Sequence, residues 1–148
     1  MLPAFVKTGP ILFVADGGGY NAPYMPHGTA WYQPYYAHAL AALGYRYDTW
    51  DVWLRGDPGS AVLDRYRTGA VVWAAPYWGR VTDSGSDSIG QLKAYLDGGG
   101  RLFITGQNIA QSLSQWSGGG FLADYLHATL QQEDTGLYAV TGVPGDPI

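Results

Sequence analysis

Three short apolar runs constrain the fold of this chain more than any other feature. They lie in residues 11–16 (ILFVAD), 70–76 (AVVWAAP) and 101–105 (RLFIT), and each leads into residues suited to a loop or turn. Continuous apolar runs of this length, without alternating polar positions, are typical of strands that are buried on both faces. Such strands occur in parallel sheets that are covered by helices. The sequence therefore predicts a parallel sheet.

Helical patterns separate these runs. In residues 31–44, Tyr36, Ala39, Leu40 and Leu43 follow helical spacing, and Gly44 suits the C-terminal cap. Pro34 is tolerated only in the first turn of a helix, so we expect this helix to begin near residues 31–33.

A second helix is predicted within residues 86–100. Ile89, Leu92 and Leu96 would share one face of it. Ser88 and Gln91 fit a capping box at its start, and the helix would end at Gly98.

The remaining elements complete an alternation of strands and helices. We expect a strand at residues 45–53, helices at 60–69, 108–116 and 121–130, and a fifth strand at 137–143. This order predicts an α/β fold: a three-layer α/β/α sandwich with a mostly parallel, five-stranded, flavodoxin-like sheet. Residues 1–148 would form a single domain.

The composition of the chain excludes several kinds of partner and of chemistry. Charged residues make up 14% of the chain, the formal net charge is −4, and the eight basic residues are scattered. We therefore expect neither nucleic acid nor a membrane as a partner. Cysteine is absent, which excludes disulfides, thiolate catalysis and Cys-based zinc sites. Residues 140–148 read as a segment interrupted in mid-course, so we expect the chain to be part of a larger protein.

A ligand site in an open parallel sheet would lie beyond the carboxyl ends of its strands. The first strand leads there to Asp16 and Asn21, the third to Trp78, and the fourth to Gln107 and Asn108. Asn108 is also placed to cap the next helix, whereas Gln107 has no evident structural role. Acids, amides and aromatic rings suit a carbohydrate, so these five residues are the candidate ligand-binding set.

Two cofactor classes are disfavoured. Residues 17–22 (GGGYNA) match a loose dinucleotide pattern, but the next helix begins about ten residues later, so its amides would not face a pyrophosphate. Asp16 and Asp51 end neighbouring strands, yet no DxD spacing or histidine accompanies them. We expect both acids to be solvated or to cap helices, and we predict no cofactor and no metal.

The turn after the fourth strand raises the question of catalysis. Residues 102–110 (LFITGQNIA) run from a strand into a helix, a junction that holds the nucleophile in several α/β enzymes. Here the turn has Thr105, Gly106 and Gln107, with neither cysteine nor serine. Thr105 and His127 are the weak catalytic candidates.

The order of these segments resembles a class I glutamine-amidotransferase-like domain, of the kind found in large secreted bacterial proteins, often beside peptidase domains. Residues 95–107 (YLDGGGRLFITGQ) and 140–148 (VTGVPGDPI) are the most specific parts. The resemblance places the nucleophilic cysteine of catalytic relatives at Thr105 or Gly106, and their oxyanion-hole glycines at residues 76–79. His127 lies near the spacing of a histidine in another branch.

The absence of a thiol at that turn favours the interpretation that the domain is not catalytic. We expect an interaction or scaffold domain of a larger extracellular protein, whose partners are neighbouring domains or other copies of itself, with a contact near residues 137–143. The alternatives are a carbohydrate-binding module at the carboxyl edge of the sheet and a hydrolase that uses Thr105 and His127.

Overall fold

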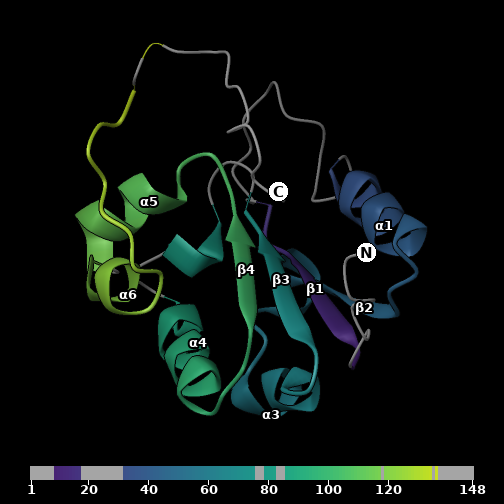
Figure 1. Cartoon of the computed structure of the whole chain (residues 1–148). Coiled ribbons are helices and arrows are strands. Elements are labelled where there is room, and N and C mark those ends of the chain that lie inside the picture. The colour runs from purple at the N-terminus through teal and green to yellow at the C-terminus, as the bar shows by residue number, and fades with distance from the viewer. Residues whose placement is uncertain are drawn as a thin grey trace, which may run out of the picture.

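A parallel sheet in the strand order β2-β1-β3-β4 organises the computed structural model of the chain (Figure 1). The structure describes residues 9–17, 32–75, 79–82, 86–117, 119–134 and 136. Its strands are β1 (Ile11–Ala15), β2 (Tyr47–Asp51), β3 (Ala70–Ala74) and β4 (Leu102–Thr105). Every pair of neighbouring strands is parallel, as predicted.

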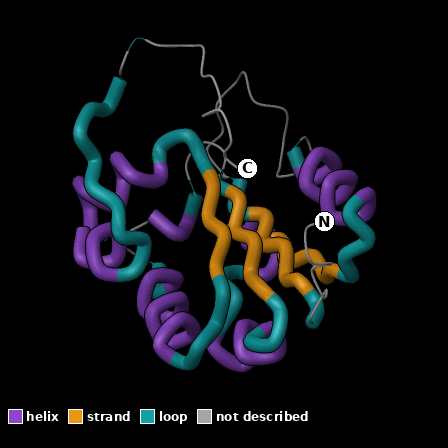
Figure 2. Tube along the Cα trace, viewed as in Figure 1, coloured by secondary structure: helices purple, strands orange, loops and turns teal. Residues whose placement is uncertain are grey.

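Helices cover both faces of this sheet (Figure 2). Helix α1 (Gln33–Ala42) packs on one face through Tyr36 and Leu40. On the other face lie α3 (Ser60–Leu63), α4 (Ser88–Asp97), α5 (Ile109–Ser112) and α6 (Gly119–Asp124). The short segments are α2 (Val52–Arg55), the 3-10 turns η2 (Asp64–Tyr66) and η3 (Arg80–Thr82), and the π-helical turn η4 (Leu113–Ser117). The α/β class is therefore confirmed.

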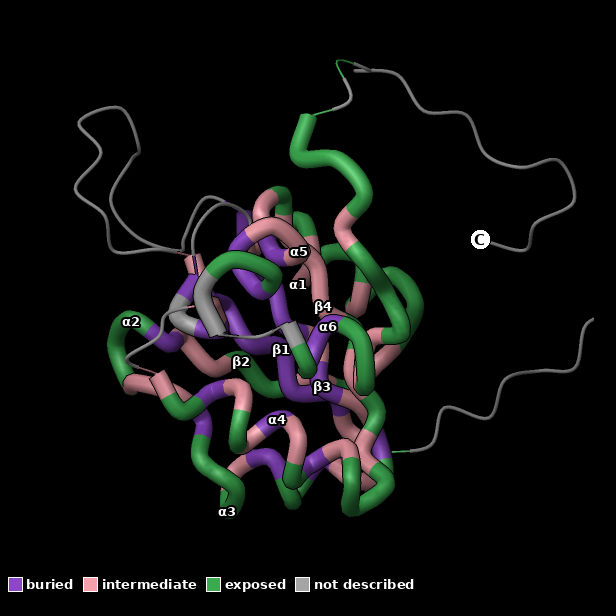
Figure 3. The backbone as a smooth tube through the Cα atoms, turned by 90° about the vertical axis from the view of Figure 1, so that its left-hand side faces the viewer, coloured by how far each residue is buried: buried purple, intermediate pink, exposed green. Residues whose placement is uncertain are grey.

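Alternate strand residues supply two cores. Leu12, Val14, Val71 and Trp73 join the larger core beneath α3 to α6, whereas Phe13, Ala15 and Ala74 join the smaller core beneath α1. Phe13 stacks on Tyr36 with ring centroids 5.2 Å apart. Figure 3 shows that the central strands β1 and β3 hold mainly buried residues. This explains why their sequences are continuously apolar.

The described sheet has four strands, not the predicted five, because the fifth, at residues 137–143, lies outside the described residues. Strand β2 is also shorter than the predicted 45–53. It ends at Asp51, whose Oδ1 accepts a hydrogen bond from the Leu54 amide at 3.1 Å and caps α2. The apolar residues after Asp51 thus belong to a helical turn.

Helix α4 confirms the predicted face but corrects the predicted cap. Leu92 is buried, and Ile89 and Leu96 pack against the same core. The N-cap is Asp87, not Ser88, and Gln91 Nε2 donates to Asp87 Oδ2 at 2.6 Å. Gly98 is the C-cap of the helix, as predicted.

The two later helices are shorter than predicted. The helix expected at 108–116 divides into α5 and η4. The helix expected at 121–130 ends at Asp124, and the Ala128 amide instead donates to the Leu122 carbonyl at 3.0 Å. His127 takes a positive φ of 50°, a conformation incompatible with a continuing α-helix.

Leu92 tests the larger core. The Leu92→Ala variant should lose about 2–5 kcal/mol of unfolding free energy, because Leu92 is 0% exposed and its loss leaves a cavity. The matched control is Leu54→Ala, since Leu54 is 78% exposed and its change should cost less than about 0.5 kcal/mol. Urea unfolding of both variants measures the difference. Equal losses would contradict the described packing.

Candidate functional site

Asp16 anchors the carboxyl edge of the sheet. It follows β1, and only 2% of the residue is exposed. Its Oδ2 accepts hydrogen bonds from Trp73 Nε1 on β3 and from the Val81 amide in η3, each at 2.9 Å. Its own amide donates to the Ala74 carbonyl at 2.8 Å. The expectation that Asp16 is solvated was therefore wrong, because donors from two other segments converge on it.

Gly79 lies directly against this carboxylate. A Cβ atom added to Gly79 would lie 2.6 Å from Asp16 Oδ2 and 2.6 Å from the Ala75 Cβ. Real side chains do not come this close, so the backbone reaches the carboxylate only because residue 79 is glycine. Asp16 thus holds β1, β3 and the start of η3 together.

Tyr32 lies beside the same acid. It is 3% exposed, and its hydroxyl donates to the Ala74 carbonyl at 3.4 Å. Burial raises the pKa of the Tyr32 hydroxyl well above its ordinary value, and the negative charges of Asp16 and Asp51 raise it further. Tyr32 therefore stays neutral next to two acids.

Asp51 has a structural role here, since it caps α2 as the sequence predicted. Within the described residues, no group of three or more His, Asp or Glu side chains is arranged to hold a metal ion.

Close packing shapes the turn after β4. The Ala75 amide donates to the Thr105 carbonyl at 2.9 Å. A Cβ atom at Gly106 would lie 1.9 Å from the Ala75 carbonyl oxygen and 2.9 Å from Ile109 Cδ1. With this backbone, position 106 has no room for any side chain. Of the two positions at which the predicted resemblance would place a nucleophile, only Thr105 has room for a side chain.

The other candidate site residues do not form one cluster in the part of the chain that the structure describes. Gln107 is exposed, and Asn108 occupies the N-cap position of α5, as predicted, without a capping hydrogen bond from its side chain. His127 is exposed beyond α6, and no hydrogen bond joins it to Thr105 in the part of the chain that the structure describes. Asn21 and Trp78 lie outside the described residues, so their ligand-binding roles stay predictions.

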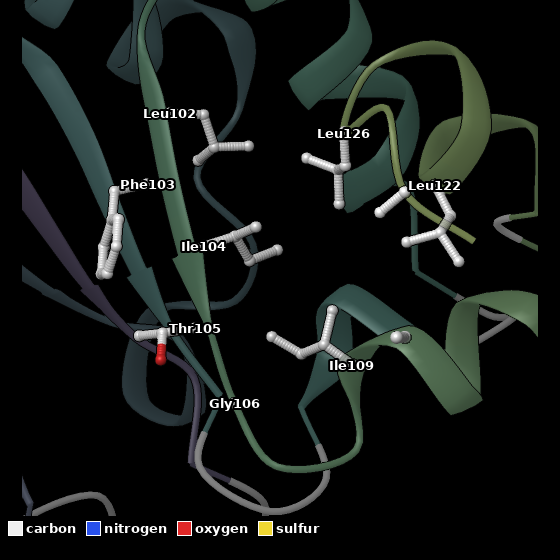
Figure 4. A pocket seen from close by; sticks show the side chains of 10 residues that line it. Leu102, Phe103, Ile104, Thr105, Gly106, Ile109, Leu122 and Leu126 are labelled. Carbon is white, nitrogen blue, oxygen red and sulfur yellow. The ribbon is translucent and has the colours of Figure 1, made fainter. Parts of the chain in front are cut away.

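An apolar groove runs beside β4. It has a volume of about 500 Å³ and contains no ionisable side chain in its lining, which consists of Leu102, Phe103, Ile104, Thr105, Gly106, Ile109, Ala110, Leu122, Leu126 and Ala128. Leu102 and Ile104 point toward Ile109, Leu122 and Leu126 (Figure 4). This groove lies on the side of the larger core. Sequence reasoning missed it because its shape depends on how α5, α6 and the residues after α6 pack beside β4, which no local pattern specifies.

The opposite face of β4 is open. Phe103 and Thr105 point away from the groove (Figure 4), and Phe103 is 58% exposed. The neighbouring Val72 on β3 is half-buried against the smaller core. Helix α1 packs on Phe13 and Tyr47, over β1 and β2, and leaves Phe103 uncovered. A large apolar side chain in the middle of a strand is therefore in contact with water.

Comparison of the chain with protein-family models, curated proteins and solved structures found no match. The amidotransferase-like resemblance accordingly stays a prediction. None of the described helices combines the length and the hydropathy needed to cross a membrane.

Gly106 tests the packing of the turn. Gly106→Ala should lower the free energy of unfolding by about 1–3 kcal/mol, because the added methyl group overlaps the Ala75 carbonyl. In the control, Gly120→Ala, the nearest atom to the new Cβ is 3.6 Å away and the site is helical, so stability should hold or rise. Thermal unfolding compares the two variants. A neutral Gly106→Ala would refute the described turn.

Proposed function

We propose that this chain is a non-catalytic interaction domain of a larger extracellular protein. Its fold would be a five-stranded, flavodoxin-like sheet of the amidotransferase type. The observed order β2-β1-β3-β4 supports this, because it matches the first four positions of the doubly wound order 2-1-3-4-5. The extracellular location rests on the resemblance described above.

The turn after β4 supports the non-catalytic part of the proposal. Covalent attack on an amide needs a nucleophile activated by a nearby base. Gly106 has no space for a reactive side chain, and the hydroxyl of Thr105 has no hydrogen bond to His127. The junction therefore has the backbone path of a nucleophile turn without the groups that would make it reactive.

The exposed face of β4 supports the proposal that the domain binds another protein surface. Phe103 is 58% exposed on a strand whose neighbour β3 is largely buried. Apolar surface of this kind is normally covered by another protein surface. In the intact protein this surface would be a neighbouring domain. In the isolated chain, a second copy would cover it.

Self-association of the isolated chain tests the contact face. Sedimentation velocity should show a concentration-dependent dimer, and Phe103→Thr should weaken dimerisation about ten- to a hundredfold, because burying a phenylalanine contributes about 1.5–3 kcal/mol. Leu54→Ala is the control, since Leu54 is 78% exposed on α2, which follows the strand at the opposite edge of the sheet from β4. A monomer at every concentration, or equal effects of both variants, would contradict this contact.

Hydrolysis assays test the absence of catalysis. Chromogenic amides and esters should show no turnover above buffer, because neither Thr105 nor Gly106 offers an activated nucleophile. Thr105→Ala and His127→Ala should leave any background rate unchanged. Turnover that disappears in either variant would establish the hydrolase alternative and overturn the proposal.

A further inference from the structure

Helix α1 contains no Asp, Glu, Lys or Arg, yet none of its residues is buried. Its inner side packs on the smaller core through Tyr36 and Leu40. Its outer side carries an exposed stripe at helical spacing, which consists of Tyr35, His38, Ala39 and Ala42. A surface helix normally turns charged residues to water, whereas a helix that lacks them on every side is typically covered on every side. The outer side of α1 therefore has the composition of a contact surface.

The open face of β4 lies on the same side of the sheet as α1. Val72 packs against the core beneath α1, and Phe103 is in register with it, so both side chains point to this face. Helix α1 itself lies over β1 and β2 (Figure 1). Neighbouring strands are about 4.8 Å apart and a helix is about 10 Å wide, so β3 and β4 together offer room for one more helix. Among the described residues, an uncovered helix face thus lies beside an uncovered strip of sheet.

We propose that, in the isolated chain, α1 of a second copy covers Phe103, and that the contact is reciprocal. The inference rests on the proposed function, because it names the element that would cover the exposed face of β4. In a dimer with two-fold symmetry both copies use the same patch, so each α1 would lie on the sheet of the other copy. The two helices would then lie side by side in one layer between two sheets.

The register of the sheet determines which residues would meet. Tyr36 stacks on Phe13, with ring centroids 5.2 Å apart. Phe13 and Phe103 lie at the same level, because both are in register with the same residue of β3. A two-fold axis parallel to the strands keeps this level, so the first turns of α1 would lie against Phe103 of the other copy. Tyr35, which is 72% exposed, and Ala39, one turn further along, would be nearest to its ring.

Charge and area both favour a second copy as the occupant. Neither α1 nor the strip formed by Val72, Phe103 and Thr105 carries a charge, so the contact would leave no ion buried without a partner. Helix α1 is only about 15 Å long, so one helix on one sheet would bury much less than the roughly 1,200 Å² at which specific interfaces begin. Reciprocity doubles this contact and adds the contact between the two helices.

Sedimentation velocity of α1 variants tests this occupant. Ala39→Glu would place a charge against Phe103 and should weaken dimerisation at least about tenfold, because a buried charge without a partner is costly. Ala94→Glu is the matched control: Ala94 is exposed on α4, which covers the opposite face of the sheet, and the net charge changes equally. This control should dimerise like the unaltered chain. Circular dichroism reports whether each variant is folded. Tyr35→Gln removes apolar area without adding a charge, so it should also weaken dimerisation and replaces Ala39→Glu if that variant does not fold.

Isotope-filtered nuclear Overhauser measurements on a mixture of labelled and unlabelled chain locate the contact directly. Contacts between the Phe103 ring of one copy and Tyr35 or Ala39 of the other are expected. A dimer that Phe103→Thr weakens but the α1 variants do not, or one in which the two Phe103 rings touch each other, would overturn this inference and leave the proposed function standing. A chain that is monomeric at every concentration would overturn this inference together with the proposed contact at Phe103.

Discussion

The hydrogen bonds accepted by the buried carboxylate of Asp16 determine how the segments are arranged at the C-terminal ends of the strands. An isolated charge in a protein interior is costly, so its position is stable only when donors surround it. Trp73 Nε1 and the Val81 amide supply such donors from β3 and η3. The same contact brings Gly79 against the carboxylate and sets Tyr32 beside it. A ligand that used Asp16 would have to share or displace these donors, so the acid acts first as a structural centre.

The turn after β4 joins a strand to a helix, as turns that hold a catalytic nucleophile do, but this backbone path does not by itself imply catalysis. The path depends on Gly106 lying against the Ala75 carbonyl, a contact that any side chain at that position would prevent. A cysteine could not be accommodated at position 106 without moving one of the two segments. Packing at this junction thus favours an inert turn. The distinctive surface of the domain lies instead on β4 itself, where Phe103 is exposed.

Much of the fold could be predicted because buried strands leave a direct mark on the sequence. Ile11–Ala15 is apolar throughout because both of its faces are buried, and Leu92 marks the inner face of α4. The burial of Asp16 could not be predicted, because it depends on Trp73, which lies 57 residues away, and no local pattern encodes that contact. The end of β2 is decided locally instead, by the hydrogen bond from the Leu54 amide to Asp51. The strand-favouring residues after Asp51 obscured that cap.

Strand alternation divides β4 into surfaces with separate roles. The side chains of Leu102 and Ile104 line the groove, their backbone groups form the outer edge, and the side chain of Phe103 lies on the opposite face. A shift of one residue in register would exchange the groove and face residues, so the pairing of β4 with β3 specifies both surfaces together. Because the side chain of Phe103 lies on the face opposite those of Leu102 and Ile104, a partner seated on Phe103 would leave the groove beside β4 unchanged.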